Sequence, residues 1–230
     1  MIKQLAFVLI SLVFFSTSSK AQQYSDSNSK ELQNYTTRAS KYNPENTKGT
    51  PYQTEGFQTG SLLNESTVIF PDVALRYNAL NDEFQIKSSL NESNKNIQAV
   101  MKKTDLYVKM GDAIYTYLLP SGEVGGYYNV LVEGTKKSIY KKLSKKFVEG
   151  AQSVNMMTGN HPNRLVDETK YYLVSVDGTI EELPNSKNRR LKLIAAKDYK
   201  SFKKYAKSND LNVKNEEDLI KLVEYYNQTY

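Results

Sequence analysis

One histidine, His161, is available for acid–base or nucleophilic catalysis in this chain of 230 residues. It lies in the sequence T-G-N-H-P-N, whose Gly and Pro are typical of a loop, and the chain has no G-x-S-x-G nucleophile turn. The scattered Asp and Glu residues offer no pair whose spacing identifies the two carboxylates of a glycosidase. We therefore predict no catalytic residue and place a hydrolase last among the functions considered.

The residue types needed for a metal or phosphate site are also scarce. The chain has no Cys and a single His, whereas protein zinc sites draw on several Cys and His side chains at fixed spacings. The run Glu216-Glu217-Asp218 holds oxygen ligands that calcium accepts, but it also suits the positive end of a helix dipole, which we favour. The sequence has no glycine-rich phosphate loop. We predict neither a metal nor a cofactor.

Lysine pairs are the most conspicuous feature of the chain. One interpretation is a basic surface that binds nucleic acid or the phosphates of lipopolysaccharide. The other is a solvated strand edge on which lysines discourage pairing with other chains. We favour the second and do not expect nucleic acid as a partner, because the formal net charge is only +6. The candidate basic surface consists of Lys136, Lys137, Lys141, Lys142, Lys145 and Lys146.

The element that must organise the fold is a β-hairpin over residues 73–87. Apolar and polar side chains alternate on both sides of a turn at residues 78–82, where Asn and Asp tolerate left-handed backbone. Its central residues, Arg76, Tyr77 and Asn78, are candidate structural residues of the hairpin. The alternation predicts one dry face and one face in water.

The rest of the chain predicts an α+β fold, with an antiparallel β-sheet (a meander or partial barrel) followed by two or three C-terminal helices. Pro71 should mark an edge, a bulge or a break in its strand. Residues 138–143 fit a strand or a helix, and we choose a strand because a glycine turn precedes them. Asn215 resembles a helix cap, followed by an apolar stripe at helical spacing. Further strands are expected at 57–63, 67–70, 97–102, 106–110, 113–118, 127–133, 170–176 and 179–183.

The N-terminus carries the pattern of a secretory signal peptide. A positive residue precedes the apolar run 5–15, and small residues at Ser19 and Ala21 predict cleavage before Gln22. The alternative is an uncleaved anchor, although the run is short for a membrane span. We predict a signal peptide (1–21), a polar, flexible leader (22–50), an antiparallel β domain (51–184) and C-terminal helices packed on the sheet (185–230).

Three short motifs in the same order carry a resemblance to a family. They are R-Y-N at residues 76–78, V-L-V-E-G at 130–134 and Y-Y-N at 225–227. In this respect the chain resembles an uncharacterised group of secreted proteins from Bacteroidetes-type bacteria. The resemblance implies export and a β-rich body with helices behind it. It implies no activity, so no site residue is carried over from it.

These observations favour an exported, non-enzymatic binding or structural module of the bacterial envelope or the extracellular space. The partner is expected to be an envelope protein, a glycan or a lipid. The alternative is a carrier that holds an apolar, lipid-like ligand on a curved sheet. Once the signal is removed, we expect the protein in the periplasm or outside the cell, not integral to the membrane, although association with the outer membrane stays open.

Overall fold

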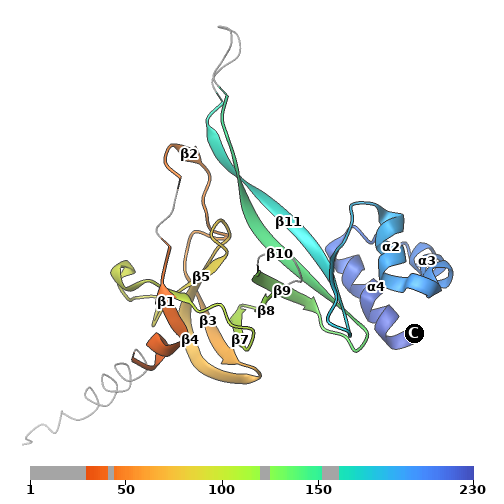
Figure 1. The fold of residues 1–230 in the computed structure, drawn as a ribbon, viewed down its shortest axis with the longest axis horizontal. Coiled ribbons are helices and arrows are strands. Elements are labelled where there is room, and N and C mark those ends of the chain that lie inside the picture. The colour runs from red at the N-terminus through yellow and green to blue at the C-terminus, as the bar shows by residue number, and fades with distance from the viewer. Residues whose placement is uncertain (1–29, 41–43, 120–124, 152–160) are drawn as a thin grey trace, which may run out of the picture.

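A computed structural model of the protein describes residues 30–40, 44–119, 125–151 and 161–230 (Figure 1). The predicted signal peptide and its cleavage site lie outside the described residues. Within them, twelve strands form one sheet in the order β1-β6-β5-β4-β3-β7-β8-β9-β10-β11-β12, and β2 pairs with β11. Neighbouring strands are antiparallel except β2 and β11, which run parallel. Three helices follow the sheet, which confirms the predicted α+β class.

The strands and helices have the following bounds. The strands are β1 (Thr36–Arg38), β2 (Thr47–Lys48), β3 (Gln58–Asn64), β4 (Thr67–Asn78), β5 (Glu83–Lys87), β6 (Gln98–Val100), β7 (Leu106–Met110), β8 (Ala113–Leu118), β9 (Gly126–Val132), β10 (Lys137–Val148), β11 (Asn163–Ser175) and β12 (Ile180–Glu182). The α-helices are α2 (Lys187–Ala195), α3 (Tyr199–Ser208) and α4 (Glu216–Thr229). Short 3-10 helices are η1 (Gln33–Tyr35), η2 (Asn94–Asn96) and η3 (Ala196–Asp198).

The first part of the sheet consists of strands β1, β6, β5, β4, β3, β7 and β8 in spatial order. It curls into a half-barrel around its own core (Figure 1). Aromatic rings dominate this core, and the ring centroid of Phe84 lies 4.7 Å from Tyr77 and 4.9 Å from Tyr127. The predicted hairpin is its centre, with Tyr77 on β4 opposite Phe84 on β5. Pro71 stands where the register of β4 against β3 shifts, so it marks a bulge as the sequence predicts.

A long hairpin of β10 and β11 connects the half-barrel to the helices (Figure 1). Its register runs without interruption from Lys137 opposite Ser175 to Val148 opposite Arg164, so the strand prediction for residues 138–143 is confirmed. β11 begins earlier than the predicted residue 170. The segment before that residue is polar and has no alternation of its own, and its extended form comes from pairing with β10.

The three helices pack on one face of β9, β10 and β11 and close a second core. Ile139 and Leu173 of the sheet meet Ile194, Leu219 and Val223 of the helices, and all five are fully buried. Helix α4 begins as the sequence predicts, because the side chain of its N-cap residue, Asn215, accepts a hydrogen bond from a backbone N–H of the first turn.

The predicted leader (22–50) is not separate from the sheet where the structure describes it. β1 pairs with β6, and β2 pairs with β11. Leu32 is only 6% exposed, and the ring of Tyr35 packs edge-on against Phe70 at 5.5 Å between centroids. These few apolar side chains dock a segment whose overall composition is polar, so residue 51 is not a boundary between leader and domain.

The prediction of a water-facing side for the 73–87 hairpin is wrong. Its polar side chains on β5 are almost fully enclosed, with Glu83 8%, Gln85 3% and Lys87 5% exposed. Segments 50–57, 88–94 and 36–40 lie against this face and supply hydrogen-bond partners to it. A polar face covered by polar groups shows the same alternation as a face in water, so the pattern alone does not distinguish them.

Candidate functional site

Arg76 on β4 is held rigidly in this enclosed polar face. Its guanidinium carbon lies 3.6 Å from the ring centroid of Tyr52 and 4.4 Å from that of Phe57. One terminal nitrogen donates to the backbone oxygen of Glu55 at 2.9 Å, and the other donates to Oε1 of Gln85 at 2.7 Å. Its Nε is buried and has no hydrogen-bond partner among the described residues. Ring stacking and two hydrogen bonds therefore orient a guanidinium that retains unused donors.

A pocket of about 380 Å³ lies beside this guanidinium, and we call it the cationic pocket. Among the described residues, three cations line it and no carboxylate does. Neither Arg38 nor Lys95 forms an ion pair within the described part of the chain, and both side chains are exposed at the rim. The lining residues are Arg38, Ala39, Ser40, Tyr52, Arg76, Gln85, Asn94, Lys95 and Ile97.

The nearby carboxylate and ammonium groups of β5 organise the walls of this pocket. Glu83 accepts from the backbone N–H of Ser40 at 3.1 Å and from Nε2 of Gln85 at 3.3 Å. Gln85 is thereby fixed so that its oxygen faces Arg76. The ammonium of Lys87 donates to the backbone oxygens of Leu90 and Glu92, at 3.3 and 2.8 Å, which holds the loop after β5 in place. These two groups hold the walls, and the charged side chains that line the pocket among the described residues are Arg38, Arg76 and Lys95.

Sequence reasoning named Arg76, Tyr77 and Asn78 as structural, and the structure divides their roles. The Tyr77 hydroxyl donates to Oδ1 of Asp82 at 2.6 Å inside the first core. Oδ1 of Asn78 accepts from two backbone N–H groups of the following turn. Arg76 has the opposite orientation and contributes to the cationic pocket. Its contacts come from residues 52–57 and from β5, so no local pattern in the sequence indicates this role.

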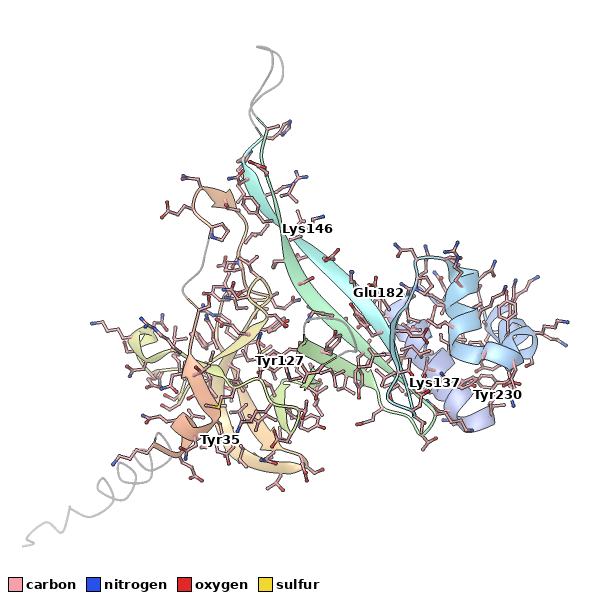
Figure 2. The ribbon with its side chains drawn as sticks, in the orientation of Figure 1. Tyr35, Tyr127, Lys137, Lys146, Glu182 and Tyr230 are labelled. Carbon is pink, nitrogen blue, oxygen red and sulfur yellow. The ribbon has the colours of Figure 1, made fainter. Side chains whose placement is uncertain are left out.

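The six lysines of the candidate basic surface do not form one exposed surface. They are distributed along the long hairpin, where Figure 2 shows Lys137 and Lys146 far apart, and successive residues of a strand point to opposite faces. Three of them are neutralised by carboxylates: Lys141 by Glu216 at 2.8 Å, Lys142 by Asp82 at 3.1 Å and Lys145 by Asp167 at 2.6 Å. The ammonium of Lys137 donates to Ser175, and Lys136 lies in the β9–β10 turn.

His161 lies just beyond the paired ends of β10 and β11, opposite Ala151, and is not among the residues that line the cationic pocket. Its side chain is exposed, and its backbone N–H donates to the oxygen of Ala151 at 2.9 Å. Among the described residues, no group of three or more His, Asp or Glu side chains is arranged to hold a metal ion. In the same part of the chain, every helix is too short or too polar to cross a membrane.

Comparison with known proteins adds no family to this description. The resemblance to secreted proteins of Bacteroidetes-type bacteria therefore stays a prediction. No protein-family model matches the sequence, and neither a curated protein nor a solved structure shows significant similarity to the chain.

Proposed function

We propose that this chain is an exported, non-catalytic binding module that recognises an anionic ligand in the cationic pocket. The observation that carries the proposal is the described lining, in which Arg38, Arg76 and Lys95 are present and no carboxylate is. Three cations around one small pocket repel one another, and an anion relieves that repulsion. Because Arg76 is already oriented by Tyr52 and Gln85, binding costs little additional side-chain entropy.

Export to the periplasm or the cell exterior belongs to the same proposal. Its support is the signal-peptide pattern of residues 1–21, with small residues before the cut at Gln22. An exported binding module meets envelope components first, and many of these carry carboxylate or phosphate groups. The cationic pocket suits such a partner better than it suits an apolar one.

The alternative function, a carrier of a lipid-like ligand, receives less support from the geometry. The apolar face of β9, β10 and β11 is already occupied by the helices, and Leu219 and Val223 are 0% exposed against it. The pockets around β1, β6 and η2 are lined mainly by charged and amide side chains. A lipid tail needs predominantly apolar walls, and these pockets do not offer them.

The proposal is tested by measuring thermal unfolding and binding heat with citrate, glucuronate, inorganic phosphate and neutral glucose at constant ionic strength. At least one anion should raise the melting temperature, whereas glucose should not, because binding only to the folded state stabilises it. The variant with Arg38→Gln and Lys95→Gln should lose this response. The matched control with Arg189→Gln and Lys200→Gln removes two exposed cations of the helices and should retain it. Equal responses from the two double variants would refute the assignment.

A further inference from the structure

The cationic pocket shares lining residues with two neighbouring hollows. A hollow of about 360 Å³ lies beside β1, and one of about 520 Å³ lies beside η2 and the loop after β5. Ile97 lines all three hollows, Arg38 is shared by the pocket and the first hollow, and Lys95 is shared by the pocket and the second. We call the three together the Ile97 groove. Its combined size exceeds what a single small anion fills.

Charge is concentrated in one part of the Ile97 groove. Of the described residues that line the hollow beside β1, Arg38 alone is charged. The others contribute hydroxyl, amide and aliphatic groups, from residues such as Gln33, Thr37 and Gln98. The hollow beside η2 sets Glu92 against Lys87 and Lys95, so its charges partly offset each other. A ligand that matches this groove places a carboxylate at the cationic pocket and offers many hydroxyls beside it. A polymer such as polyphosphate, which has a charged group at every position and no sugar hydroxyls, does not match it.

We infer that the ligand is an acidic polysaccharide, bound along the Ile97 groove with a sugar carboxylate in the cationic pocket. The inference rests on the proposed function and names the ligand class of the same site. The guanidinium groups of Arg38 and Arg76 suit a planar carboxylate, since their donors lie in a fork that matches its two oxygens. The amide and hydroxyl side chains of the adjoining hollow suit the hydroxyls of a neighbouring sugar.

The inference is tested by calorimetry with galacturonic acid, its α-1,4-linked trimer, maltotriose and tripolyphosphate at constant ionic strength. The trimer should bind at least about tenfold more tightly than the monomer, because three equivalent units alone give only about threefold by statistics. Maltotriose should not bind measurably. Thr37→Glu places a negative charge in the hollow beside β1 and should weaken the trimer about fivefold more than it weakens the monomer, because only the trimer extends into that hollow. The control Thr169→Glu, at an exposed position of β11, should change neither affinity.

The outcomes separate this inference from the proposed function. Equal affinities for monomer and trimer would overturn the groove and leave the cationic pocket intact. Tighter binding of tripolyphosphate than of the trimer would overturn the sugar assignment and still support an anion site. Absence of binding by every anion would refute the proposed function itself. An unchanged trimer affinity in Thr37→Glu would overturn the placement of the polysaccharide along the hollow beside β1.

Discussion

Asp82 is the residue whose removal should most damage the connection between the half-barrel and the long hairpin. It lies in the turn between β4 and β5 with a φ of 50°. Oδ1 accepts from the Tyr77 hydroxyl at 2.6 Å and from the Tyr127 N–H at 3.1 Å, and Oδ2 accepts from the Lys142 ammonium at 3.1 Å. One carboxylate thus joins β4 to β9 and β10. The side chains of Asp82 and Lys142 are 22% and 20% exposed, so water screens their interaction only in part.

The expected cost follows from these contacts. Asp82→Asn keeps the side-chain size and the tolerance for positive φ but removes the charge that pairs with Lys142. A hydrogen bond to a charged group contributes about 1.5–3 kcal/mol, and after a discount for partial exposure we expect a loss of about 2 kcal/mol in the free energy of unfolding. Asp82→Gly removes all three bonds without strain at positive φ, and we expect a loss of about 3 kcal/mol.

Urea unfolding followed by circular dichroism measures these losses. Asp72 provides the matched control, because it also has a positive φ, of 54°, and its side chain is exposed. Asp72→Asn should change stability by less than about 0.5 kcal/mol. A double-mutant cycle of Asp82→Asn with Lys142→Met should show a coupling of about 1 kcal/mol or more. If Asp82→Asn is as mild as Asp72→Asn, the carboxylate does not join the two parts of the sheet and the reasoning is refuted.

Four other predictions concern the docking of α4, the ionisation of Tyr171 and export. Asn227→Ala removes three hydrogen bonds to the partly exposed β9–β10 turn and should cost about 2 kcal/mol in urea unfolding. Val223→Asp buries an unpaired charge in the second core and should cost about 3 kcal/mol or more, and an unchanged melting temperature would contradict the docking of α4. Burial, together with a hydrogen bond to a carboxylate of α4, raises the pKa of Tyr171 to about 12. Its contribution to stability is therefore complete below about pH 10 and is lost as the pH rises through about 12, so Tyr171→Phe should flatten the fall in unfolding free energy over that range. N-terminal sequencing of protein from the envelope or the medium should begin at Gln22, and a chain that begins at Met1 would contradict export by cleavage.

Local patterns predicted the elements that form from their own sequence. β7 and β8 have the predicted bounds, because each alternates or is β-branched and is flanked by turn residues. The cap at Asn215 and the apolar stripe of α4 were also evident, since both are defined within a single helix. In these segments the local preference and the tertiary environment agree.

Elements that depend on distant partners were not predicted. β1 and β2 are short and polar, and they are extended because their backbones pair with β6 and β11 respectively. The same holds for the first half of β11, which pairs with β10 in continuous register. The cationic pocket is the clearest example, because its residues come from five separate segments and no spacing in the chain connects them.

Two of the three motifs that suggested a family, V-L-V-E-G and Y-Y-N, meet where α4 contacts the β9–β10 turn. Oδ1 of Asn227, in the Y-Y-N motif, accepts from the backbone N–H groups of Lys136 and Lys137 at 3.0 and 2.9 Å. Its amide nitrogen donates to the backbone oxygen of Lys137 at 2.8 Å. A Cβ at Gly134, in the V-L-V-E-G motif, would collide with the same amide, so the placement of the asparagine requires glycine at position 134. These motifs therefore specify how α4 docks on the β9–β10 turn. The R-Y-N motif differs, because strand alternation places Tyr77 in the core and Arg76 on the opposite face, where it lines the cationic pocket.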